Sequence, residues 1–97
     1  MQNKNIIITI PAYNEEKTLP TVLEEISVVM KKTPYQYQTL VVNDGSTDKT
    51  EKIAKDKGAK VISHKTRRGL IETFKTEMKA CLDLNADIIV HTDADGQ

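Results

Sequence analysis

Two carboxylates near the end of the chain have the spacing of a cation site. Asp93 and Asp95 stand two positions apart, directly after an apolar run at residues 86–91. In an extended backbone these side chains point the same way, so both can face one ion, and their mutual repulsion is unfavourable without it. Mg²⁺ and Mn²⁺ prefer oxygen ligands, and Mg²⁺ is usually held by one or two carboxylates together with substrate phosphates. The pair therefore favours a site for a divalent cation and a diphosphate, although Asp-x-Asp also occurs in polar loops that bind nothing.

Two further polar clusters follow apolar runs earlier in the chain. Tyr13 and Glu15 come after the run at residues 6–10, and Asp44 comes after the run at residues 39–42. The Gly-Ser-Thr-Asp segment behind Asp44 is explained by a turn and a helix cap, which do not need Asp44 itself. A carboxylate at a strand tip can accept a hydrogen bond from a base N–H or a ribose hydroxyl. These clusters therefore predict contacts with a nucleotide.

The apolar periodicity predicts the elements that position these residues. Short runs rich in β-branched residues predict strands at 6–10, 39–42, 59–63 and 86–91, and helical spacing predicts helices at 18–32, 48–57 and 70–82. Strands that alternate with helices favour a parallel sheet covered on both faces, here a three-layer α/β/α Rossmann-like sheet of order 3-2-1-4. The carboxyl ends of its strands would share one edge, so the three polar clusters would converge there. The basic segment 64–68 would be either a diphosphate contact or a solvated loop.

Composition narrows the range of partners. The 97 residues suffice for one small domain, and 14 basic side chains balance 14 acidic ones, which does not favour a nucleic-acid partner. The single cysteine, Cys81, stands at helical apolar spacing and is expected to be a buried core thiol. Because the sequence stops on acids just after a strand, we expect residues 1–97 to be part of a larger domain.

Four segments carry a resemblance to a known family: PAYNEE at 11–16, VVNDGSTD at 41–48, RGL at 68–70 and DADGQ at 93–97. In this order they resemble the N-terminal half of a family 2 glycosyltransferase with the GT-A fold. The likeness is to the branch of dolichyl-phosphate mannose synthases and polyprenyl-phosphate glycosyltransferases, and it covers essentially the whole chain. It implies that residues 1–97 form the half of the catalytic domain that binds the nucleotide sugar.

The resemblance implies roles for individual residues. A nucleotide pocket would be lined by Pro11, Ala12, Tyr13, Glu15, Asp44 and Asp93. Asp44 would hydrogen-bond the base, Arg68 would contact the diphosphate, and the Asp93–Asp95 pair would hold Mg²⁺ or Mn²⁺. The donor would be a UDP- or GDP-linked sugar and the acceptor a lipid phosphate, with the ion stabilising the leaving diphosphate. The catalytic base of the family lies beyond Gln97, so we expect these residues to be inactive alone. We also expect them to associate as a homo-dimer, and the full-length protein to be cytoplasmic, at the membrane face.

This sequence departs from the family at three positions, and two other interpretations stay open. Arg67 and Ile71 stand where the family commonly has Asn and Gly, and Glu77 replaces a common glycine. DADGQ also resembles the Asp-x-Asp-Gly-Thr segment of haloacid dehalogenase-like phosphatases, with Gln97 in place of the Thr. The Asp-x-Ser-x-Asp spacing at residues 44–48 resembles the metal-dependent adhesion site of a non-catalytic binding module.

Overall fold

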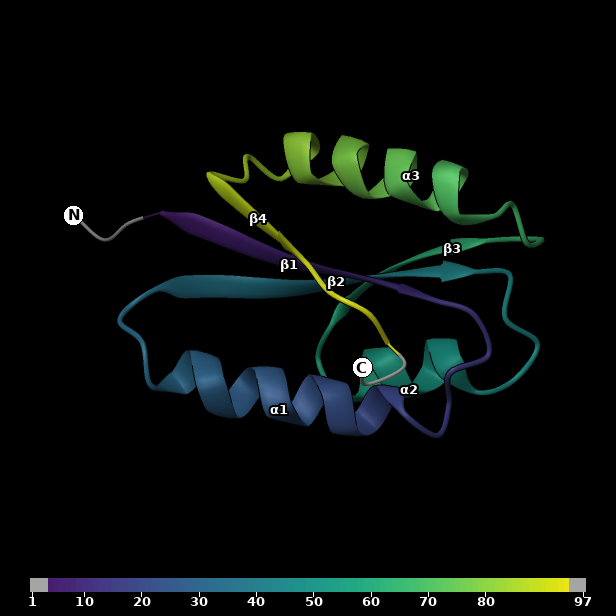
Figure 1. The fold of residues 1–97 in the computed structure, drawn as a ribbon, viewed down its shortest axis with the longest axis horizontal. Coiled ribbons are helices and arrows are strands. Elements are labelled where there is room, and N and C mark those ends of the chain that lie inside the picture. The colour runs from purple at the N-terminus through teal and green to yellow at the C-terminus, as the bar shows by residue number, and fades with distance from the viewer. Residues whose placement is uncertain (1–3, 95–97) are drawn as a thin grey trace.

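The computed structural model describes residues 4–94 and confirms the alternation of strands and helices (Figure 1). The elements are β1 (Asn5–Ala12), α1 (Leu19–Lys31), β2 (Gln36–Asp44), α2 (Thr50–Asp56), β3 (Lys60–His64), α3 (Leu70–Asp83) and β4 (Ile88–His91). Pro20 lies in the first turn of α1, where its missing N–H has no intrahelical partner to lose.

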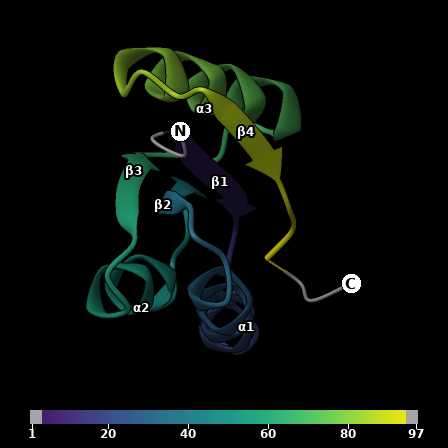
Figure 2. The ribbon, with the colours of Figure 1, turned by 90° about the vertical axis from the view of Figure 1, so that its left-hand side faces the viewer.

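The strands form one parallel sheet in the order β3-β2-β1-β4. Figure 2 shows α3 covering one face of this sheet and α1 and α2 covering the other. The predicted three-layer architecture and strand order are therefore confirmed. Because all four strands run the same way, their carboxyl ends lie along one edge of the sheet.

Three strands end later than the sequence pattern predicts, and one of them is β1, which continues through Pro11 to Ala12 in parallel pairing with β2. β2 continues through Asn43 to Asp44, and β3 ends on His64, because parallel pairing extends to Asn43↔Ser63 and Asp44↔His64. His64 was predicted to begin the basic loop at 64–68, and this is wrong, because His64 is the last residue of β3 and its side chain is buried. Hydrogen bonds between neighbouring strands thus extend the strands over polar residues, which the apolar pattern does not include.

The core consists of one apolar cluster on each face of the sheet. Towards α1 and α2 it includes Ile10, Leu19 and Val41, and towards α3 it includes Leu40 and Cys81, all fully buried. Burying a side chain of the size of Ile or Leu stabilises a fold by about 1.5–3 kcal/mol. The predicted core position of Cys81 is confirmed, and burial, followed by the nearby charge of Glu77, raises the pKa of its thiol.

The edge of the sheet at β4 differs from this core. Ile88, Ile89 and Val90 are each about two-fifths exposed, and Leu70 and Ile71 are 73% exposed at the start of α3. Between residues 4 and 94, no helix is both long and apolar enough to cross a bilayer.

Candidate functional site

A cavity of about 190 Å³ lies at the carboxyl ends of the strands. Its lining residues are Pro11, Ala12, Tyr13, Glu15, Asp44, Arg67, Gly69, Leu70, Thr73, Asp93 and Ala94. All six residues predicted to contact a nucleotide are among them, although they come from the ends of three strands. Asp95, the second member of the predicted metal pair, lies outside the described residues.

The loops after β1 and β2 are locked together by hydrogen bonds. The Asn14 amide donates to Ser46 Oγ at 2.8 Å, and the Thr47 amide donates back to Asn14 Oδ1 at 2.8 Å. The Glu15 amide donates to the hydroxyl of Thr50 at 2.9 Å. Asn14 has a φ of 52°, a left-handed conformation that asparagine tolerates better than most residues. These bonds fix the backbone that presents Tyr13 and Glu15 to the cavity.

Asp48 completes this lock. Its carboxylate accepts hydrogen bonds from the Thr50 amide at 2.9 Å, from the Thr50 hydroxyl and from the Glu16 amide at 3.3 Å. Burial opposes ionisation, but these hydrogen bonds outweigh it and lower the pKa of Asp48. Glu51, in the first turn of α2, pairs with Lys55 Nζ at 2.9 Å. Asp48 therefore joins the start of α2 to the β1 loop.

Asp44 is the most heavily bonded residue of the cavity. Its Oδ1 accepts from His64 Nδ1 and from the Arg68 amide, both at 2.8 Å, and its Oδ2 accepts from the Gly69 amide at 2.9 Å. Burial opposes ionisation here too, but the hydrogen bond from His64 and those from the two amides lower the pKa of the carboxyl. Asp44 is therefore an ionised acceptor that ties β2 to β3 and to the segment before α3.

These contacts bear on the adhesion-site interpretation. Ser46 Oγ accepts from Asn14, while Asp44 and Asp48 accept from different backbone segments. The three side chains of the Asp-x-Ser-x-Asp pattern thus belong to separate hydrogen-bond sets. Helix capping and loop locking account for Ser46 and Asp48 without a cation.

Arg67 and Arg68 differ in how they contribute to the cavity, although the sequence predicted a diphosphate contact only for Arg68. Arg68 contributes its amide to Asp44, while the guanidinium that lines the cavity is that of Arg67. Arg67 Cζ lies 4.1 Å from the centroid of the Tyr13 ring, within the range of a cation–π contact. Sequence analysis did not single out Arg67 for the site. Only its place in a basic segment ahead of a helix pointed to it.

Asp93 stands at the open rim of the cavity, two residues after β4. The chain on either side is held by the Thr92 amide, which donates to the Thr9 carbonyl at 3.0 Å, and by Thr18 Oγ1, which donates to the Ala94 carbonyl at 2.7 Å. Within residues 4–94, no group of three or more His, Cys, Asp or Glu side chains is arranged to hold a metal ion by itself. An exposed carboxylate of this kind fits an ion shared with phosphate oxygens better than an all-protein cage.

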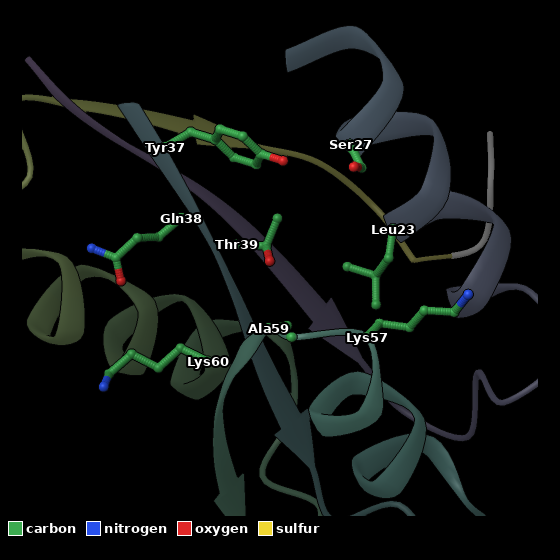
Figure 3. A pocket seen from close by; sticks show the side chains of 9 residues that line it. Leu23, Ser27, Tyr37, Gln38, Thr39, Lys57, Ala59 and Lys60 are labelled. Carbon is green, nitrogen blue, oxygen red and sulfur yellow. The ribbon is translucent and has the colours of Figure 1, made fainter. Parts of the chain in front are cut away.

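A larger hollow of about 500 Å³ lies at the other end of the sheet (Figure 3). It is bordered by Leu23 and Ser27 of α1, the start of β2 and the connection into β3, and its charged residues are Lys57 and Lys60. Lys57 Nζ already lies 3.1 Å from Glu24 Oε1. Ligands of open parallel sheets bind outside the carboxyl ends of the strands, so the smaller cavity is the better candidate site.

Comparison with known proteins agrees with this geometry. The sequence model of one protein family, described as "Glycosyl transferase family 2", matches residues 7–97. The chain belongs to glycosyl transferase family 2. The predicted family is thereby confirmed, and the phosphatase interpretation of residues 93–97 loses its basis, because the same residues fall within the matched region.

Curated relatives of this family 2 chain are considerably longer. An uncharacterized protein of Methanocaldococcus jannaschii is 41% identical over 92 residues, which cover 95% of this chain and 36% of that protein. The UDP-N-acetylglucosamine–dolichyl-phosphate N-acetylglucosaminyltransferase of Methanococcus voltae is 34% identical, with 100% of this chain and 43% of that protein covered. The chain thus spans about two-fifths of the length of these relatives.

Solved structures confirm the GT-A fold. Glucosyl-3-phosphoglycerate synthase from Mycobacterium tuberculosis, in complex with UDP, superposes with a TM-score of 0.77 at 31% identity, covering 95% of this chain and 34% of that one. The same enzyme in complex with Mn²⁺, UDP and glucosyl-3-phosphoglycerate gives a TM-score of 0.76 at 30% identity, covering 94% and 33%. The described residues therefore form the N-terminal half of a GT-A fold.

Proposed function

We propose that this chain is the donor-binding part of a metal-dependent glycosyltransferase that uses a nucleoside diphosphate sugar. The observation that carries the proposal is the cavity at the strand ends, where Tyr13, Glu15, Asp44 and Asp93 meet although up to 80 positions separate them. The UDP complexes of the mycobacterial synthase support a UDP-linked donor over a GDP-linked one.

Each side of the cavity suits one part of such a donor. The ionised and buried Asp44 carboxylate would accept an N–H of the base. Tyr13 offers an aromatic face near that position, and Glu15 an acceptor for the base or the ribose. The Arg67 guanidinium, which lies over the Tyr13 ring, offers charge and several N–H donors to an anionic diphosphate.

The metal ion would be Mg²⁺ or Mn²⁺, and Asp93 and Asp95 would hold it together with the donor's phosphate oxygens. When bound, such an ion neutralises charge on the leaving diphosphate. The Mn²⁺-containing complexes of the mycobacterial synthase support this choice of ion. The residues of this chain would contribute by holding the base and the ribose in a fixed place, so that the reacting carbon of the sugar is oriented towards an acceptor.

For the acceptor we propose a polyprenyl phosphate. The name of the Methanococcus voltae relative, a dolichyl-phosphate N-acetylglucosaminyltransferase, supports that class. An acceptor of this kind would place the protein at the cytoplasmic face of a membrane. The residues of this chain are assigned to the donor and the metal, so we expect donor binding without measurable sugar transfer from the 97-residue chain alone.

The test is isothermal titration calorimetry of the 97-residue chain with UDP and with GDP, each with and without Mn²⁺. UDP should bind, and Mn²⁺ should tighten UDP binding. Asp93→Asn should remove most of the Mn²⁺ effect and leave metal-free UDP binding nearly unchanged. The matched control is Asp56→Asn, because Asp56 is an exposed carboxylate on α2 that pairs with Lys52.

Three results would contradict the proposal. One is the absence of heat with UDP at millimolar concentration in the presence of Mn²⁺. Another is equal loss of the Mn²⁺ effect in Asp93→Asn and Asp56→Asn. The third is UDP binding that survives Asp44→Ala unchanged, since Asp44 lines the cavity and is its proposed contact with the base.

A further inference from the structure

His64 is not among the residues that line the donor cavity, but it contacts Asp44, which is one of them. Its imidazole is buried and joins three elements. Nδ1 lies 2.8 Å from Asp44 Oδ1 on β2, and Nε2 lies 2.9 Å from Thr76 Oγ1 on α3. No donor contact proposed above involves His64, so its effect on the site must pass through Asp44.

The hydrogen on Nδ1 follows from the partners of the ring. An ionised carboxylate can only accept, so the ring nitrogen that faces Asp44 must carry a hydrogen. The Thr76 hydroxyl has one hydrogen and lies within reach of both Nε2 and the Glu72 carbonyl, at 3.1 Å from the latter. Whichever way that hydroxyl turns, Nδ1 remains a donor to Asp44.

The acceptor capacity of Asp44 can then be counted. Oδ1 receives two hydrogens, from His64 Nδ1 and the Arg68 amide, which fill its two in-plane lone pairs. Oδ2 receives one, from the Gly69 amide. The carboxylate therefore has one good acceptor position left, on Oδ2, and it has no hydrogen of its own to donate.

We propose that His64 is a positioning residue that fixes this single acceptor, so that the site selects bases that carry an N–H at that point and rejects bases that carry a lone pair there. The inference rests on the proposed donor site and adds its base selectivity. Uracil has an N3–H, whereas cytosine has an unprotonated N3 in the same place. A UDP-linked donor would be accepted and a CDP-linked one refused, because two acceptors would face each other with no hydrogen between them.

Two variants separate positioning from simple packing. In His64→Asn, the side-chain amide nitrogen can take the place of Nδ1 and keep the hydrogen bond to Asp44. In His64→Gln, the amide nitrogen reaches the place of Nε2, towards Thr76, and the donor to Asp44 is lost. Both variants are neutral and similarly polar, so they differ mainly in which of the two contacts they retain.

The measurement is the ratio of the dissociation constants for CDP and UDP, by calorimetry with Mn²⁺ present. The unaltered chain should prefer UDP by about 100-fold, the scale on which an unpaired buried polar group weakens binding. His64→Asn should keep this ratio within about threefold, and His64→Gln should reduce it to less than about tenfold. A ratio that stays the same in His64→Gln, or that falls equally in both variants, would overturn the proposal.

Two spectroscopic readouts do not depend on nucleotide binding. In a long-range ¹⁵N–¹H spectrum of the unaltered chain, Nδ1 of His64 should be protonated. An unprotonated Nδ1 would overturn the proposal even if both variants failed to fold. The amide resonances of Arg68 and Gly69, which donate to Asp44, should move in His64→Gln and stay in place in His64→Asn. If UDP does not bind at all, the donor site itself is wrong, and these spectra still decide whether His64 orients Asp44.

Discussion

The two sides of the strand-end edge are built differently. On the side of β1, β2 and β3, the loops hold one another through hydrogen bonds such as Asn14 to Ser46, Glu16 to Asp48 and Gly69 to Asp44. On the side of β4, the strand is four residues long, partly exposed, and followed by Asp93 at an open rim. The proposed base and ribose contacts thus lie on the side with dense hydrogen bonding, and the proposed metal contact on the side without it.

The carboxylates of the two sides show the same contrast. Asp44 and Asp48 accept several hydrogen bonds, and their pKa values are lowered. Glu77 of α3 is fully buried beside β4, and neither of its oxygens has an aligned hydrogen-bond partner among the described residues. His91 Nδ1 lies 2.9 Å from Glu77 Oε1 without hydrogen-bond alignment. Burial raises the pKa of Glu77, and the charge of His91 only partly offsets this. The fold therefore stabilises the ionised forms of Asp44 and Asp48 on the side of β1, β2 and β3. On the side of β4 it disfavours the ionised form of Glu77.

The largest expected effect comes from Gly45→Ala, which would push the loop after β2 away from residues 66–67, the loop after β3. A Cβ at Gly45 would meet the Arg67 nitrogen at 2.4 Å and the Thr66 carbonyl carbon at 2.5 Å, and the residue has a φ of +73°. Neither backbone atom can move without disturbing the segment that contacts Asp44. We expect a loss of about 3 kcal/mol in the free energy of unfolding, measured by urea denaturation.

Gly58→Ala is the control for this substitution. Gly58 has a similar φ of +86°, but a Cβ there would meet nothing within 4 Å. Its replacement should cost about 1 kcal/mol, from the backbone conformation alone. Equal losses in the two variants would mean that the close approach of Gly45 to residues 66–67 contributes nothing to stability.

The second prediction concerns Glu77→Gln. Because the pKa of Glu77 is raised on folding, its protonated form stabilises the fold at low pH, and this contribution is lost as the pH rises from the ordinary value of 4.5 through the raised one. Gln cannot ionise, so the variant should be more stable than the parent at pH 7 and no more stable at pH 4. Urea denaturation at both pH values measures this difference.

Asp44→Asn supplies the opposite sign as a control. The lowered pKa of Asp44 gives stability that is present above its ordinary value of 3.8 and lost as the pH falls through the lowered one. The variant should therefore be less stable than the parent at pH 7, by an amount that shrinks in acid. If Glu77→Gln and Asp44→Asn changed stability in the same direction at pH 7, the contrast between the two sides would be wrong.

Most of the fold could be predicted from the sequence, because apolar periodicity alone distinguishes buried strands from amphipathic helices. Residues 6–10 and 39–42 are continuous β-branched or aliphatic runs, which is typical of strands buried on both faces. The ends of β1, β2 and β3 were missed, since pairings such as Ala12 with Asn43 and Asp44 with His64 depend on register, which periodicity does not encode. Short polar extensions of a strand become visible only once its neighbour is known.

The convergence of the site residues at one edge of the sheet could be predicted from the topology. The contacts between their side chains could be predicted only in part. Tyr13, Asp44 and Asp93 lie at the carboxyl ends of different strands, and a parallel sheet brings such positions to one edge independently of loop conformation. The roles of His64 and Arg67 depend on loop conformation and side-chain direction. Neither has a spacing signature, so sequence reasoning could place them near the site but could not assign His64 to Asp44 or Arg67 to Tyr13.

The third prediction tests the lock between the β1 loop and α2. Asp48→Ala removes an acceptor shared by the Thr50 and Glu16 amides and should destabilise the fold by about 1 kcal/mol at pH 7. Since the pKa of Asp48 is lowered, the loss should diminish as the pH falls through that value. The control is Asp83→Ala, because Asp83 forms an exposed pair with Lys79. That pair is worth less than about 0.5 kcal/mol, and a larger effect at Asp83 than at Asp48 would contradict the lock.

The smallest expected effect belongs to Thr18→Val, on the β4 side. The Thr18 hydroxyl donates to the Ala94 carbonyl at 2.7 Å, one of few contacts that hold the chain next to Asp93. Valine has the same shape and no donor, so global stability should fall by less than about 1 kcal/mol. Local opening should increase more clearly, and the Thr92 amide, which donates to Thr9, should exchange its hydrogen several-fold faster. Thr21→Val, at an exposed position on the same helix, should leave that exchange unchanged. If the Thr92 amide exchanged at the same rate in both variants, backbone pairing alone would hold the end of β4. Asp93 would then be as firmly placed as Asp44, and the contrast between the two sides would be wrong.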